Sequence, residues 1–144
     1  MKTANGMFTY TDTFIGKTLH SHIINVHNIL AKKCNWGAGI INKGAFGYDN
    51  IAMSIGYIFK YCPDKLNKEC LCEFAHDGWA TNYAYWRDNK PWLTNSSYKK
   101  PGKPLGDSRR NKLALMEYAD LPKEEKITNI IIAEYILDII PTIS

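Results

Sequence analysis

The most constraining feature of this sequence is a strongly apolar segment near its C-terminus, at residues 127–140. Placed on a helix of 3.6 residues per turn, its large apolar residues cover nearly all faces: Ile130, Ile131, Ile132, Tyr135, Ile136, Leu137, Ile139 and Ile140. Such a helix is either buried in the centre of a fold or packed on one side against another chain. Asn129, Glu134 and Asp138 interrupt the segment, which is also shorter than the roughly 20 apolar residues of a membrane span.

Three earlier segments have the apolar spacing of amphipathic helices. We predict a first helix over about residues 18–34, a second from Tyr48 to a stop at Pro63, and a third over about 65–88. Pro122 with Glu124 and Glu125 is typical of a first helical turn. Thr128 is the expected N-cap of a separate last helix over about 129–140, and Pro141 its expected end. The Gly-rich segment 35–47 and the Pro-rich segment 89–112 are predicted loops with room for a short β-hairpin.

These elements predict a mainly α, single-domain fold. At 144 residues the chain can bury one ordinary hydrophobic core. Residues 1–18 are the expected N-terminal arm, and residues 19–144 the helical domain. Because the N-terminus lacks an apolar signal segment, we expect a cytoplasmic protein. The four cysteines are accordingly expected to be reduced, mostly buried thiols: Cys34, Cys62, Cys70 and Cys72.

Positive charge is concentrated in one part of the chain. Residues 87–112 contain eight basic and two acidic residues, a net charge of +6, whereas the whole chain carries +4. The remainder is therefore slightly acidic, at −2. A localised positive field on such a body favours an anionic partner, and the alternative is a solvated loop that uses lysines for solubility.

The candidate site combines aromatic, amide and cationic side chains in and beside this basic segment. His76, Trp79 and Tyr83 are spaced i, i+3 and i+7, so one helix face should carry all three. Aromatic rings can stack on a nucleotide base, an amide can read its edge, and arginine can hold a phosphate with two hydrogen bonds. The predicted ligand-binding residues are His76, Trp79, Asn82, Tyr83, Trp86, Trp92, Tyr98, Arg109, Arg110 and Lys112. The alternative for Trp79 and Tyr83 is a place in the hydrophobic core.

Other chemistries have weaker support in the sequence. The pI of 8.8 is below that of most nucleic-acid-binding domains, and no zinc-finger or RRM signature is present, so nucleic acid is a less favoured partner. Two groups of residues contain metal-ligating side chains, but neither has the usual zinc spacing: His20, His22 and His27, and Cys70, Cys72 and His76. No hydrolase or kinase signature is present, and His76 and Asp77 would point about 100° apart on a helix. We expect neither a metal, a cofactor nor catalysis.

The region of residues 74–140 resembles the ryanodine-receptor (RyR) domain, a small, mostly helical module. The resemblance is carried by an ordered set of residues: His76 and Trp79 as a His-x-x-Trp motif, then Leu115, Tyr118, Leu121, Pro122, Glu124, Glu125 and Lys126, followed by Ala133 and Leu137. Two departures concern the pocket. The usual Gly-Trp-x-x-Gly is not visible, and Asn129 and Ile130 stand where an Asp-Arg pair is common.

The resemblance implies a helical fold and the binding of nucleotides. Prokaryotic members of the family look like sensors in nucleotide-signalled conflict systems, and by analogy a small phage or viral member would sequester such a signal. We therefore expect non-catalytic binding of a nucleotide or a nucleotide-derived signal. The alternatives are a protein-interaction module that acts through residues 130–140 and a nucleic-acid-binding protein. The apolar last helix also predicts a homo-oligomer.

Overall fold

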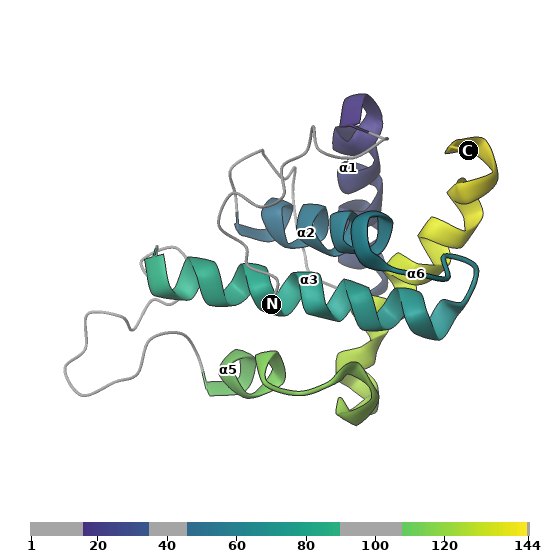
Figure 1. Cartoon of the computed structure of the whole chain (residues 1–144). Helices are drawn as coiled ribbons and strands as arrows, with labels where there is room; N and C mark the ends of the chain where they lie inside the picture. The colour runs from purple at the N-terminus through teal and green to yellow at the C-terminus, as the bar shows by residue number, and fades with distance from the viewer. Residues whose placement is uncertain (1–15, 35–45, 90–107, 144) are drawn as a thin grey trace.

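Helix α3 runs through the middle of the molecule, with α2 along one side and α5 along the other (Figure 1). The computed structural model describes residues 16–34, 46–89 and 108–143. In these ranges the elements are α1 (Gly16–Lys33), α2 (Phe46–Tyr61), α3 (Lys68–Asn89), α5 (Ser108–Ala114), the short 3-10 helix η2 (Tyr118–Asp120) and α6 (Lys123–Ile143). The described part of the chain contains no strand, so the prediction of a mainly α, single-domain fold is confirmed.

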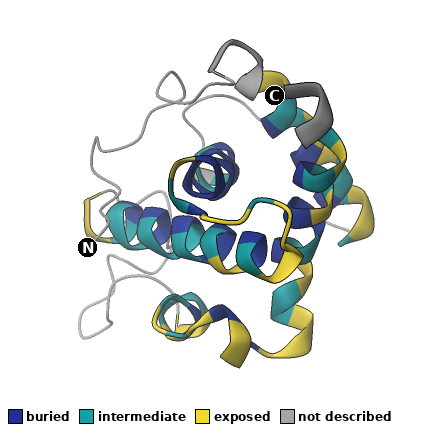
Figure 2. Cartoon of the chain, turned by 45° about the vertical axis from the view of Figure 1, so that its right-hand side comes forward, coloured by how far each residue is buried: buried dark blue, intermediate teal, exposed yellow. Residues whose placement is uncertain are grey.

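The core forms where α2 is enclosed by its neighbours. Every residue of α2 from 51 to 59 is buried, because α1, α3 and α6 all pack against this helix (Figure 2). Of the two places expected for the last helix, the centre of the fold is not the one that α6 occupies, and packing against another chain stays a prediction. In α6, Ile132 and Ile136 are buried but Ile127, Glu134 and Asp138 are exposed. The centrally buried helix is α2.

The predicted helices agree with α1, α2 and α3 to within a few residues, and the reason for the later start of α3 is local. The Asn67 side chain accepts a hydrogen bond from the Cys70 backbone N–H at 3.1 Å. This is the geometry of an N-cap, so α3 begins at Lys68 and not near residue 65. In α1, Lys32 and Lys33 lie in the last turn, where their positive charges interact favourably with the helix dipole.

Three other predictions are wrong: the loop at residues 108–112, the N-cap at Thr128 and the helix end at Pro141. Residues 108–112 belong to α5 and not to a loop. A single helix, α6, covers both the turn that follows Pro122 and the last helix predicted from residue 129, so Thr128 lies inside it and not at its N-cap. The Pro122 carbonyl accepts the N–H groups of Glu125 and Lys126 at 2.9 and 3.2 Å, which starts the helix at once. Pro141 lies in the last turn, where its missing N–H removes a single hydrogen bond.

Some predictions concern residues that the structure does not describe. The arm falls mostly in residues 1–15, and the space for a β-hairpin falls in residues 35–45 and 90–107. Residues 16–18, which the arm was expected to include, belong to α1. None of the helices in the described ranges has the length and apolar character needed to cross a bilayer.

Candidate functional site

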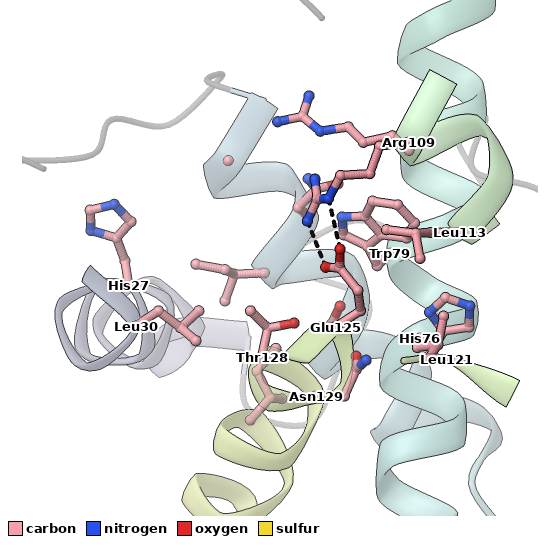
Figure 3. Close-up of a pocket in the computed structure, with 16 residues that line it drawn as sticks. His27, Leu30, His76, Trp79, Arg109, Leu113, Leu121, Glu125, Thr128 and Asn129 are labelled. Carbon is pink, nitrogen blue, oxygen red and sulfur yellow. Dashed lines mark hydrogen bonds and ion pairs between the residues drawn. The ribbon is translucent and has the colours of Figure 1, made fainter. Parts of the chain in front are cut away.

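A pocket of about 440 Å³ opens where the helices converge. Figure 3 shows residues of α1 on one side, residues of α3 on the other, and residues of α6 between them. The α2 wall contributes Asn50, Ile51 and Ser54, and α5 contributes Arg109, Arg110 and Leu113. Pockets that bind small molecules usually have volumes of about 300–1,000 Å³. The size therefore suits a ligand of the nucleotide class.

Buried polar side chains gather around this pocket. Five polar residues are buried in the described part of the chain, and four of them line the pocket: His27, Ser54, His76 and Asn129. The fifth, Asn82, donates from Nδ2 to Oδ1 of the pocket residue Asn50 at 2.6 Å. Because a buried polar group costs free energy unless it is hydrogen-bonded, such residues are not scattered at random in a helical core. Their convergence gives the pocket a partly polar lining.

His76 lines the pocket in a fixed orientation. Its Nε2 lies 2.8 Å from the carbonyl oxygen of Met116, and a carbonyl can only accept, so Nε2 carries the proton. In the neutral ring Nδ1 is then the acceptor. The contact also ties α3 to the segment that follows α5. His76 is only 3% exposed, so the ring has little freedom to leave this position.

Three aromatic side chains of α3 stack on one another next to the pocket. His76 and Trp79 are stacked with ring centroids 5.8 Å apart, and Trp79 and Tyr83 with centroids 5.5 Å apart and planes 4° from parallel. The Arg87 guanidinium lies over the Tyr83 ring at 5.7 Å. The predicted common face of His76, Trp79 and Tyr83 is therefore confirmed. Since Trp79 has a ring of its own helix on either side, little of its surface is left for a stacked base.

At the edge of the pocket, Arg109 and Glu125 form an ion pair between α5 and α6. Arg109 donates from Nε and Nη2 to the two carboxylate oxygens at 2.7 and 2.6 Å. The Arg109 side chain is 63% exposed and that of Glu125 is 21% exposed. Arg110 lines the pocket beside them. An entering anion would find two guanidinium groups there, one of them already oriented by a carboxylate.

Four of the ten predicted ligand-binding residues line the pocket: His76, Trp79, Arg109 and Arg110. Three others are structural supports behind it. Asn82 holds Asn50, Tyr83 is fully buried and donates to Asn111 Oδ1 at 2.9 Å, and Trp86 is buried and donates to Asp49 Oδ2 at 3.2 Å.

The other three lie elsewhere. Lys112 is exposed on α5 and does not line the pocket. Trp92 and Tyr98 are outside the described residues. For Tyr83, the alternative of a core residue holds. For Trp86, burial leaves no accessible ring face, so the predicted stacking of a base on it is not possible in this arrangement.

The sequence prediction missed polar residues that lie on apolar helix faces: His27, Asn50, Ser54, Glu125, Thr128 and Asn129. A signal for two of them is present in the sequence. Asn129 interrupts the most apolar segment, and His27 follows directly on Val26 in the apolar stripe of α1. A polar residue at a position that the helical pattern assigns to the core is a candidate for a buried site.

The residues considered for metal binding are not brought together. His20 Nδ1 lies 2.6 Å from the Tyr48 hydroxyl, and His22 Nδ1 lies 2.7 Å from the Tyr135 hydroxyl. Across the described segments, no three His, Cys, Asp or Glu side chains are placed to hold a metal ion.

Comparison of the chain with protein-family models, with curated proteins and with solved structures gives no match.

Proposed function

We propose that this protein binds a nucleotide or a nucleotide-derived signal in the pocket between α1, α2, α3, α5 and α6, without altering it chemically. The observation that carries the proposal is the position of Asn129. Its side chain lines the pocket and is only 5% exposed. Three other buried polar residues, His27, Ser54 and His76, line the same pocket. The Asn129 amide offers a donor and an acceptor at this position, so a ligand with a matching edge could hydrogen-bond to it.

The ligand's polar head would bind deep in the pocket. An amide offers one donor side and one acceptor side, the pattern needed to read the edge of a base. Asn129, Asn50 and the Nδ1 atom of His76 supply such groups on three helices. Because Trp79 lies between His76 and Tyr83, recognition would depend on hydrogen bonds to the base edge more than on stacking.

The ligand's phosphate would bind at the rim, next to Arg109 and Arg110. Guanidinium groups bind phosphate through paired hydrogen bonds, and Glu125 already holds the fork of Arg109 in one orientation. A phosphate could replace the carboxylate on Arg109 or bind the neighbouring Arg110. The net positive charge of residues 87–112 would favour the approach of an anion.

Binding without catalysis is consistent with how the lining groups are used. The Ser54 hydroxyl donates to the Ala75 carbonyl at 2.9 Å, the Nε2 proton of His76 is directed to Met116, and Glu125 is paired with Arg109. A nucleophile needs a neighbouring base to activate it, and these three groups are engaged in structural contacts instead. The resemblance to the RyR domain supports the same class of function.

The test is a thermal-shift screen of the purified protein against mono-, di- and cyclic nucleotides and ADP-ribose-type compounds, followed by calorimetry. Binding to the folded state alone stabilises a protein by about 2.7 kcal/mol at a ligand concentration of 100 Kd, so a true ligand gives a saturable shift. Chromatography of the ligand after prolonged incubation should recover it unchanged. A flat response across the panel would refute nucleotide binding and favour a protein-interaction role, and a processed ligand would refute the non-catalytic part.

A further inference from the structure

Two cysteines lie in contact at the turn between α2 and α3. Cys62 directly follows α2, and Cys70 is in the first turn of α3. Their Sγ atoms are 2.9 Å apart. A disulfide bond has a length of about 2.05 Å, so a small displacement separates this contact from a covalent bond.

The turn itself holds both cysteines in place. Asp64 Oδ1 accepts the Leu66 N–H at 3.2 Å, and the Asp64 carbonyl accepts the Asn67 N–H at 3.2 Å. Asn67 in turn caps α3 through the N–H of Cys70 itself. The Lys65 ammonium donates to the Cys62 carbonyl at 2.9 Å. The two sulfurs are therefore brought together by the backbone of an ordered turn and not by chance rotamers on distant elements.

The two sulfurs differ in their environment. Cys62 is 2% exposed, whereas Cys70 is half-buried and therefore within reach of solvent. Burial and the Cys70 contact raise the pKa of the Cys62 thiol to about 11. Cys62 is thus a protected, protonated thiol at neutral pH. A reagent that enters from solution meets Cys70 first.

We propose that Cys62 and Cys70 are a thiol–disulfide exchange site, which a low-molecular-weight disulfide such as oxidised glutathione converts to an intramolecular disulfide. The Cys70 thiolate attacks one sulfur of the reagent, forms a mixed disulfide and releases one glutathione thiolate. Cys62 then loses its proton to solvent and attacks the Cys70 sulfur, which releases the second glutathione. The protein loses two electrons and two protons, and one oxidised glutathione becomes two reduced molecules.

The site differs from the nucleotide pocket and does not depend on it. A Cys62–Cys70 bond would join the end of α2 to the start of α3, the two helices that supply Asn50, Ser54, His76 and Trp79 to the pocket wall. Closing this short loop reduces the conformational freedom of the unfolded chain. The oxidised protein should therefore melt at a higher temperature than the reduced one.

The test uses the full-length reduced protein, incubated at pH 8 with excess oxidised glutathione. The product is then unfolded, alkylated with iodoacetamide and analysed by intact mass and peptide mapping. The proposal predicts the loss of two alkylation sites, at Cys62 and Cys70, a mass decrease of two hydrogens and no retained glutathione. It also predicts a rise in melting temperature that dithiothreitol reverses.

Variants separate this pair from the other thiols. Cys34→Ser and Cys72→Ser should still form the bond, whereas Cys62→Ala should stop at a stable glutathione adduct on Cys70. If the wild-type protein retains glutathione on Cys70 while Cys62 remains alkylatable, the proposal is overturned. Four alkylatable cysteines after the same incubation would overturn it as well. The wild-type mapping gives this answer even if a variant fails to fold.

Discussion

Arg109 on α5 and Glu125 on α6 are joined by two parallel hydrogen bonds, of 2.7 and 2.6 Å, at the edge of the pocket. Because Arg109 is 63% exposed, the pair is screened by solvent, and exposed ion pairs of this kind contribute only about 0.2–1 kcal/mol to stability. The two hydrogen bonds fix the orientation of the Arg109 guanidinium but contribute little to the stability of the fold. The pair presents a fixed guanidinium next to the buried polar groups of the pocket.

Replacing Arg109 by alanine should weaken nucleotide binding more than tenfold and leave the melting temperature nearly unchanged. The phosphate would lose an oriented cation, while the fold would lose a solvent-exposed pair. Calorimetry and thermal unfolding of the same preparations measure the two effects. Lys112→Ala is the matched control, since Lys112 is exposed on the same short helix and does not line the pocket. If wild type and Arg109→Ala bind the nucleotide with equal affinity, Arg109 does not contact the ligand.

Asn129→Leu should abolish nucleotide binding without reducing stability. The leucine has the same branching and the same number of side-chain heavy atoms, and it replaces a pocket-lining amide by an apolar group, so the free energy of unfolding should change little. Urea denaturation measures the stability, and calorimetry with the ligand from the screen measures the binding. A clear loss of stability would instead identify Asn129 as a structural residue. Retained binding would show that its amide does not contact the ligand.

Gly78→Ala should destabilise the protein by about 1–3 kcal/mol, the usual range for overpacking. A Cβ atom at position 78 would lie 2.4 Å from the Met53 carbonyl oxygen and 2.9 Å from the Ser54 Cα, so backbone would have to move. The sign is diagnostic, because helix propensity alone predicts that Gly→Ala in a helix stabilises by up to about 1 kcal/mol. Chemical denaturation gives the value, and an increase in stability would show that α2 and α3 separate easily.

The stability of the reduced protein should fall as the pH rises from about 9 to 11. Burial raises the pKa of Cys62 to about 11 and also raises the pKa values of Cys72, Tyr48, Tyr57 and Tyr118. In this range the folded state binds more protons than the unfolded state, so the free energy of unfolding decreases with pH. Below about pH 9 the contribution is fully present.

Urea denaturation at pH 8 and pH 10.5, with reductant present, measures this alkaline loss. Cys62→Ala removes one of the responsible groups and should lose less stability between the two pH values than wild type. A wild-type protein that is equally stable at both would contradict the expected protonation of these buried groups.

The expected homo-oligomer is checked by light scattering coupled to size exclusion. In the described residues, α6 buries Ile131, Ile132, Ala133 and Ile136 within its own chain, and Ile127 remains 44% exposed. If copies associate through α6, Ile127→Glu should dissociate them at unchanged secondary structure. A wild-type mass of 16.4 kDa would show a monomer and withdraw the expectation.

Helix positions were predictable here because they depend on local patterns. The apolar spacing of Ile23, Val26 and Leu30 fixes α1, and the shared face of His76, Trp79 and Tyr83 follows from helix geometry alone. The predicted helix boundaries were wrong where the local sequence pattern was compatible with more than one structure. Nothing in the sequence at Thr128 distinguishes an N-cap from a helix interior once Pro122 has already started the helix.

The pocket was harder to predict because it depends on which faces meet. Asn50 and Asn129 are 79 positions apart and lie on different helices, and only packing places both in one pocket. The charge of Arg109 and Arg110 was enough to predict them as binding residues. No local pattern indicated that Tyr83 and Trp86 would be buried next to the site, or that Glu125 would line it. Polar interruptions of apolar stripes, such as Asn129, were the usable signal.

The close approach of α2 and α3 at Gly78 has a consequence for how a ligand can enter. At this point backbone lies against backbone, so no side chain can change rotamer to let the two helices move relative to each other. Asn50, Ser54, His76 and Trp79 form the pocket wall on these two helices, and we expect this wall to keep its shape when a ligand enters. We therefore expect a wider entrance to come from movement of α1, α5 or α6, and a movement that separates α5 from α6 would break the Arg109–Glu125 ion pair.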